Sequence, residues 1–246
     1  MKYYKNVKSY SVTWLANTYD KNTSQGTIAN YYLPETMEEF TELCRELYRK
    51  NEKFHVVGST SNVYIRPNTS FKHMISIRLL NRFYLDNDFM VCECGASVKR
   101  IVRRMVIDGI DGYACMIDLP GTIGGGVYGN AGVSRHSIVR QLKDVTVLLD
   151  NGSIRTFSPD DLGFTFRSSA LKRGELQGII LSCRLKRTPG NKKEIEDEAM
   201  MVHEWRKENQ PGAARNLGTT SLLSIAKPTL KGKLLRGIAT VGAFVL

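Results

Sequence analysis

No stretch of the 246 residues is apolar over the length that a membrane-spanning helix needs, about 20 residues. The apolar tail, residues 234–246 (LLRGIATVGAFVL), is shorter than that. Residues 1–20 hold basic side chains but lack the continuous apolar core of a secretory signal peptide. We therefore expect a cytoplasmic protein without a membrane span. The tail has the composition of a buried strand or of an end that a partner protein covers.

Patterns of metal ligands are missing as well. Zinc sites usually combine a C-x₂₋₄-C pair with a matching second pair. Here Cys92 and Cys94 have no such counterpart among the five cysteines, and the four histidines are scattered. We expect no metal site. An odd number of scattered cysteines without a signal peptide is typical of free, mostly buried thiols.

Acidic residues are few relative to basic ones, and the formal net charge is +11. The basic residues are nevertheless spread over the chain, and no RNP sequence, zinc finger or helix-turn-helix pattern accompanies them. A basic surface also attracts anionic small molecules such as nucleotide sugars and pyridine dinucleotide phosphates. We therefore expect an anionic small-molecule ligand and no nucleic-acid partner.

The order of the expected elements indicates an α+β fold. A strand over residues 27–33 precedes a helix that begins in a capping box at residues 36–39, and a second strand follows at residues 54–57. Arg187 and the four residues after it, TPGN, form the clearest boundary. Between these points the patterns predict a strand over 90–94, an amphipathic helix over 97–108, a hairpin over 144–157 and a buried strand over 178–185.

Two stretches of small residues lie about sixty positions apart. Residues 118–132 (DLPGTIGGGVYGNAG) hold six glycines in fifteen positions, and residues 58–62 (GSTSN) directly follow an expected strand. Glycine costs roughly 0.5–1 kcal/mol in a regular element, so such a run indicates a backbone that lies against a phosphate, a flat ring or another strand. Small residues also let backbone N–H groups and hydroxyls point at an anion. Neither stretch is a Walker loop or a G-x-G-x-x-G motif, and a pair of them fits an extended diphosphate cofactor.

Several motifs together resemble those of a known family. Residues 56–62 (VVGSTSN), 119–127 (LPGTIGGGV) and 130–132 (NAG) resemble the FAD-binding signatures of the MurB family. These are the UDP-N-acetylenolpyruvoylglucosamine reductases, flavoproteins of the vanillyl-alcohol-oxidase type. Residues 162–169 (LGFTFRSS) are similar to the family's F-x-Y-R-x-S segment, and Gln210-Pro211 is similar to the Q-P before its catalytic serine loop. The resemblance extends over roughly residues 27–220.

The resemblance implies a two-subdomain FAD-binding fold of the vanillyl-alcohol-oxidase/MurB type. Residues 1–187 would form the FAD-binding domain, with subdomains at about 1–57 and 58–187, and residues 188–246 a shortened substrate region. The FAD would be non-covalent, because the first stretch has no histidine. The residues that would bind it are Gly58, Ser59, Thr60, Ser61, Asn62, Pro120, Gly121, Thr122, Gly124, Gly125, Asn130, Ala131 and Gly132.

The chemistry that the resemblance implies is a hydride relay. NADPH would reduce FAD, and the flavin would pass hydride to the enolpyruvyl double bond of a UDP-sugar. Arg167 matches the arginine that polarises the substrate, and Thr219 stands where the family has its catalytic serine. Phe166 replaces the family's tyrosine, and the family's C-terminal glutamate has no counterpart.

These departures leave three functions open. The first is an FAD-dependent oxidoreductase of MurB ancestry that acts on another nucleotide sugar or cell-envelope precursor. The second is an authentic UDP-N-acetylmuramate dehydrogenase that works with Thr219. The third is a flavin-binding protein that has lost catalysis and serves as a partner subunit, with its apolar tail as the contact. The motifs leave open the substrate, the electron donor and the oligomeric state.

Overall fold

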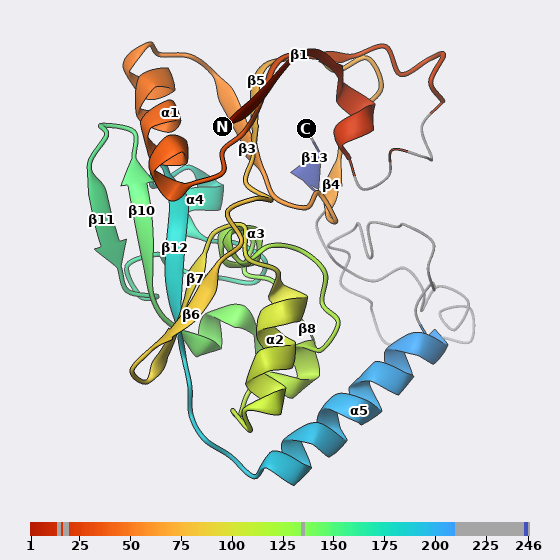
Figure 1. The fold of residues 1–246 in the computed structure, drawn as a ribbon, viewed down its shortest axis with the longest axis vertical. Helices are drawn as coiled ribbons and strands as arrows, with labels where there is room; N and C mark the ends of the chain where they lie inside the picture. The colour runs from red at the N-terminus through yellow and green to blue at the C-terminus, as the bar shows by residue number, and fades with distance from the viewer. Residues whose placement is uncertain (14–15, 17–19, 134–135, 210–243, 246) are drawn as a thin grey trace.

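A computed structural model describes residues 1–13, 16, 20–133, 136–209 and 244–245. Its first sheet has the strand order β1-β2-β5-β3, with β1 at Lys2–Lys8, β2 at Thr27–Leu33, β3 at Phe54–Val57 and β5 at Phe71–Ser76. The strands β2, β5 and β3 run parallel, and β1 is an antiparallel edge strand (Figure 1). Helix α1, Met37–Arg49, connects β2 to β3.

Helix α1 begins where the capping pattern predicts. The hydroxyl oxygen of Thr36 accepts a hydrogen bond from the backbone N–H of Glu39 at 3.2 Å. The apolar face of the helix buries Phe40, Leu43 and Leu47 in the main core. The C-terminal half of the helix also contacts the second sheet: Arg45 Nε donates a hydrogen bond to the carbonyl oxygen of Gly152 at 3.0 Å. The helix therefore packs between the two sheets.

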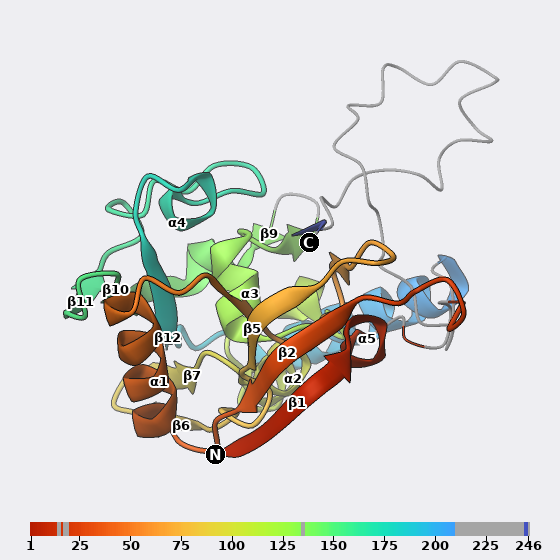
Figure 2. The same cartoon turned by 90° about the horizontal axis from the view of Figure 1, so that it is seen from above.

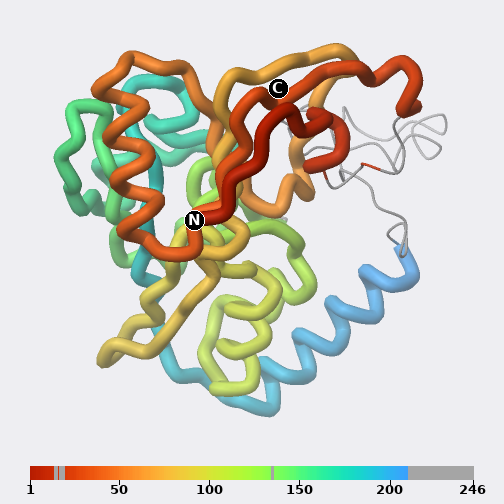
Figure 3. Tube along the Cα trace, turned by 45° about the horizontal axis from the view of Figure 1, so that its top comes forward, coloured from red at the N-terminus to blue at the C-terminus, as the bar shows by residue number. Residues whose placement is uncertain are grey.

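The second sheet is antiparallel throughout and has the order β11-β10-β12-β7-β6. Helix α2, Val98–Ile107, follows β7 and begins at Ser97, whose hydroxyl oxygen accepts from the N–H of Arg100. Helix α5, Lys192–Asn209, packs beside α2 along the edge of the molecule (Figure 3). The strands of this sheet are β6 at Phe83–Asp86, β7 at Phe89–Glu93, β10 at Leu142–Leu149, β11 at Ile154–Phe157 and β12 at Gly178–Lys186.

Short elements complete the described part of the chain. Helix α3, Ile123–Tyr128, lies between the first sheet and β12 in two perpendicular views (Figures 1 and 2). Near the C-terminus, β13 at Phe244–Val245 pairs in parallel with β4 at Val63–Tyr64. The remaining elements are α4 at Ala170–Arg173, β8 at Gly132–Val133, β9 at His136–Ser137, and the 3₁₀ turns η1 at Ser9–Val12, η3 at Ala114–Met116 and η4 at Ile138–Gln141.

The expected α+β elements are confirmed, with three differences. The glycine-rich stretch was not expected to hold a helix, but Thr122 caps α3 and the side chains of Ile123 and Val127 are buried. Strand β1 was not expected, since its side chains are largely exposed and lack an apolar alternation. Strand β5 inserts between β2 and β3 and extends the first sheet to Ser76. We therefore propose that the first subdomain continues to Ser76 instead of ending near residue 57.

All five cysteines are free, and only Cys115 is not fully buried, as predicted. Among the described residues, no helix is long and apolar enough to cross a membrane. The same part of the chain holds no group of three or more His, Cys, Asp or Glu side chains that could bind a metal. Most of the apolar tail lies outside the described residues, as do Gln210-Pro211 and Thr219.

Candidate cofactor site

Two adjoining cavities open between the sheets. The first, of about 120 Å³, is lined by both stretches of small residues, and the second, of about 480 Å³, is lined by β3, the end of α1 and the start of β12. They share Gly58, Val63 and Gly125 as lining residues, so they form one elongated space. Such a two-part shape suits a ligand with two chemically different halves.

The first stretch, Gly58–Asn62, leaves β3 and forms one wall of the first cavity. Its backbone is tightly bent, since Thr60 has a left-handed φ of 56°. A Cβ atom on Gly58 would lie only 2.3 Å from Thr122 Oγ1. Glycine is therefore required at position 58 because the two stretches touch each other there.

The second stretch supplies the opposite wall through Pro120, Gly121, Thr122, Gly125 and Ala131. Its consecutive glycines have different surroundings. A Cβ on Gly124, which lines the second cavity, would meet the carbonyl oxygen of Cys94 at 2.9 Å. A Cβ on Gly125 would have one close neighbour, Thr122 Oγ1 at 3.3 Å, and Gly125 is exposed toward both cavities. Gly124 is thus explained by packing, whereas Gly125 keeps the cavity wall free of a side chain.

Two predicted cofactor residues do not line either cavity. Asn130 donates from Nδ2 to the carbonyl oxygen of Thr165 at 2.7 Å, and the carbonyl oxygen of Gly132 accepts from Arg167 Nη2 at 2.7 Å. Both residues therefore connect the second stretch to the turn that carries Arg167. The structure brings the other predicted cofactor residues together around the shared space.

Arg167 lines the first cavity from a strained position. Its φ is 57°, a left-handed value that is uncommon for residues other than glycine and is often found at functional sites. Its Nε is buried and has no hydrogen-bond partner among the described residues. Burial lowers the pKa of the Arg167 guanidinium. A half-buried cation whose Nε–H has no acceptor among the described residues is complementary to an anion in the cavity.

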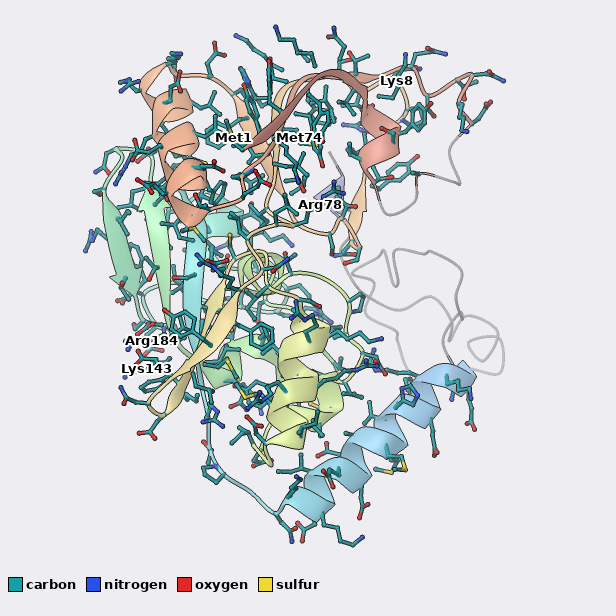
Figure 4. All side chains as sticks on the ribbon, in the orientation of Figure 1. Met1, Lys8, Met74, Arg78, Lys143 and Arg184 are labelled. Carbon is teal, nitrogen blue, oxygen red and sulfur yellow. The ribbon has the colours of Figure 1, made fainter. Side chains whose placement is uncertain are left out.

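Two other arginines, by contrast, form ion pairs with acidic residues. Arg184, labelled on the second sheet in Figure 4, pairs with Asp144 on the neighbouring strand. Arg187 pairs with Asp108 at 3.1 Å. No ion pair to a carboxylate occurs for Arg167 within the described chain. Its charge is therefore available to a ligand.

The sequence did not point to several cavity residues. Lys172 lines the first cavity from α4, and its Nζ donates to the carbonyl oxygen of Arg167 at 2.8 Å. The second cavity is lined by Tyr48, His55 and Ile179, which come from α1, β3 and β12. Nothing in the sequence shows that these separate segments meet. The half-buried ring of His55 has its pKa lowered, first by burial and then by the charge of Lys53.

Asp118 fixes the start of the second stretch. Its carboxylate pairs with Lys99 at 2.9 Å and Arg103 at 3.0 Å on α2, and with His203 Nδ1 at 2.5 Å on α5. Burial opposes ionisation, but the hydrogen bonds from His203 and Lys99 and the nearby positive charges outweigh it and lower the pKa of Asp118 to about 2. This cluster joins both helices to the residues just before Pro120.

Asp118→Asn is expected to destabilise the protein at pH 7. The ionised carboxylate binds its partners only in the folded state, so its contribution is present above the unfolded pKa near 4 and is lost as the pH falls toward about 2. Solvent screens the exposed cations, so we expect a loss of about 1 kcal/mol. Urea unfolding of the unchanged chain and of Asp118→Asn at pH 7 and pH 2.5 measures this loss in the free energy of unfolding. Equal losses at the two pH values would contradict the ionic role.

The cavities fit a flavin dinucleotide. The first has backbone N–H groups and hydroxyls that suit a diphosphate, and Arg167 and Lys172 make the same cavity attractive to anions. The second offers Tyr48, Phe54 and Ile179 as apolar surfaces against which a flat heterocycle can lie. Residues 28–158 match the family model described as "FAD binding domain", which is more than half of the chain. The chain belongs to this family. FAD is the cofactor that this membership indicates.

Two curated relatives of this FAD-binding chain are named as UDP-N-acetylenolpyruvoylglucosamine reductases. The chain is 30% identical over 210 residues to UDP-N-acetylenolpyruvoylglucosamine reductase 1 of Corynebacterium glutamicum. This match covers 84% of the chain and 62% of the relative. The chain is 27% identical over 190 residues to the corresponding reductase of Lactobacillus acidophilus, covering 77% of the chain and 63% of the relative. The FAD-binding chain thus spans less than two thirds of the length of these relatives. The matches confirm the resemblance to the MurB family.

A solved structure confirms the predicted fold. UDP-N-acetylenolpyruvylglucosamine reductase (MurB) from Thermus caldophilus superposes with a TM-score of 0.69 at 24% identity, covering 89% of the FAD-binding chain and 73% of that protein. Because the identity is low, this likeness concerns the fold alone.

Proposed function

We propose that the chain is an FAD-dependent oxidoreductase related to UDP-N-acetylenolpyruvoylglucosamine reductase. It would move hydride from NADPH through FAD to a nucleotide sugar or a related cell-envelope precursor. The observation that supports this most strongly is the guanidinium of Arg167, which lines the cavity between the two glycine-rich stretches, pairs with no carboxylate of the described residues and has a buried Nε without a hydrogen-bond partner among them. The names of the curated relatives supply the substrate class.

The residues would divide the work by location. Gly58–Asn62 and Pro120–Gly125 would hold the diphosphate through backbone N–H groups, and the second cavity would take the adenosine half. Bound FAD supplies two-electron hydride chemistry. Arg167 would stabilise the negative charge that develops on the acceptor carboxylate as hydride reaches the double bond. Thr219 would donate the proton to the adjacent carbon; it lies outside the described residues and remains a sequence prediction.

Phe166 bears on which acceptor is used. Its ring is 70% exposed, and the guanidinium carbon of Arg167 lies 5.7 Å from the ring centroid. In the MurB-like motif a tyrosine would stand here, so a hydroxyl is lost beside the arginine. This supports an acceptor that is bound without that hydroxyl. For this reason we propose a class of acceptor, nucleotide sugars and related precursors, and not one compound.

Anaerobic visible spectroscopy tests the proposal. NADPH is expected to bleach the absorption band of the bound oxidised flavin, and enolpyruvyl UDP-N-acetylglucosamine is expected to restore it without oxygen. Reduction by dithionite is the control that shows the flavin to be reducible. If NADPH left the band unchanged and the dithionite-reduced protein did not react with the UDP-sugar, the oxidoreductase function would be wrong. The degenerate partner subunit would then be the better hypothesis.

A further inference from the structure

The left-handed backbone of Arg167 needs neighbours that hold it in place. Backbone hydrogen bonds of 3.1 and 3.2 Å between Thr165 and Ser168 close the turn around it. On one side its guanidinium donates to the carbonyl oxygen of Gly132. On the other side its own carbonyl oxygen accepts from Lys172 Nζ at 2.8 Å. The direction of the guanidinium therefore depends on contacts at both ends of the residue.

Lys172 is itself anchored to the glycine-rich stretch. Ser169, which is fully buried, accepts a hydrogen bond from the backbone N–H of Lys172 at 3.2 Å. The same hydroxyl donates to the carbonyl oxygen of Tyr128 at 2.7 Å, at the end of α3. The backbone of Lys172 is thus tied through Ser169 to the helix that forms the cavity wall.

Arg167 and Lys172 place two positive charges on one cavity. Burial lowers the pKa of the Lys172 ammonium group, and the charge of Arg167 lowers it further. Two like charges in a partly dry site repel each other, and an anion between them would relieve the repulsion. Both residues line the first cavity, so such an anion would lie beside the bound cofactor.

We propose that Lys172 is a positioning residue for Arg167, whose ammonium group holds the Arg167 carbonyl so that the guanidinium faces an anionic group of the acceptor. The inference rests on the proposed function for the identity of the acceptor. The positioning itself concerns residues of this chain and can be measured without turnover.

The first test is structural. Crystal structures of the Lys172→Met and Lys172→Arg variants are compared with the unchanged chain. In Lys172→Met we expect the φ of Arg167 to leave the left-handed region and the bond from Arg167 to Gly132 to break, whereas Lys172→Arg keeps both. Arg173→Met is the matched control, since Arg173 is an exposed residue of the same short helix that pairs with Glu175. An unchanged Arg167 in Lys172→Met would overturn the proposal.

The second test is a double-mutant cycle on the rate at which the UDP-sugar reoxidises the reduced flavin. Lys172→Met alone is expected to lower this rate about 30-fold while changing the dissociation constant of FAD less than about threefold. In an Arg167→Met background the same substitution is expected to lower the rate less than about threefold, because Lys172 acts through Arg167. Independent, multiplying losses would contradict a positioning role.

The two tests separate this inference from the proposed function. If the UDP-sugar did not react with any variant, the proposed acceptor would be wrong, while the crystal structures would still decide whether Lys172 positions Arg167. If the reaction proceeded normally in Lys172→Met, the proposed function would stand and the positioning role would be wrong.

Discussion

Gly125→Val is expected to abolish the retention of FAD while the protein stays folded. Gly125 faces both cavities, and the added side chain would occupy the space proposed for the cofactor. We expect the dissociation constant of FAD to rise at least about 100-fold, which corresponds to about 2.7 kcal/mol. Titration of the cofactor-free protein with FAD, followed by the change in flavin absorption, measures it.

Two further glycine variants make this prediction specific. Gly125→Ala is expected to weaken FAD binding less, yet to raise the stability of the cofactor-free protein by roughly 0.5 kcal/mol, because alanine is favoured over glycine within helix α3. Gly124→Val is expected to lower that stability by about 1–3 kcal/mol, because its Cβ would press on the carbonyl of Cys94. A Gly125→Val protein that remained fully loaded with FAD would refute the cofactor site.

Arg167→Ala is expected to leave FAD bound and to lower the rate of acceptor reduction about 10²–10³-fold, the usual effect of removing one group that stabilises developing negative charge. In the proposed site the backbone N–H groups of the two stretches would hold the diphosphate, so the flavin spectrum should stay that of the bound form. Reduction of the flavin by NADPH should change little. Stopped-flow absorption measures the two half-reactions separately.

The control for Arg167 is its own lysine variant. Arg167→Lys keeps a positive charge but loses the bond geometry to Gly132, so its rate should fall between those of Arg167→Ala and the unchanged chain. Loss of FAD and loss of acceptor reduction in equal measure would show that Arg167 is structural.

Much of the fold could be predicted because local signals agree with it. The capping residues Thr36 and Ser97 begin α1 and α2 where the apolar periodicity starts. Strand β1 could not be predicted, because it is held by pairing with β2 and not by a buried face. Helix α3 was hidden by glycine, whose low helix propensity is overridden by the burial of Ile123 and Val127.

The candidate site likewise has residues that could be predicted from the sequence and residues that could not. Gly58–Asn62 and the second stretch could be found because their composition is unusual and their motifs resemble those of a family. Lys172 could not, since its place beside Arg167 depends on the short helix α4 and on the contact between Ser169 and Tyr128. The second cavity was equally invisible, because Tyr48 and Ile179 meet only after both sheets have assembled.

The contact between Gly58 and Thr122 has a consequence for folding. Gly58 follows β3 of the first sheet and Thr122 caps helix α3, and their contact leaves no room for even a methyl group. The cofactor site therefore exists only when both halves of the chain are native and docked, and neither half alone can offer it. FAD stabilises by mass action only the species that binds it. Its presence thus couples the two halves into one cooperative unfolding unit, and saturation with flavin reports the completion of folding.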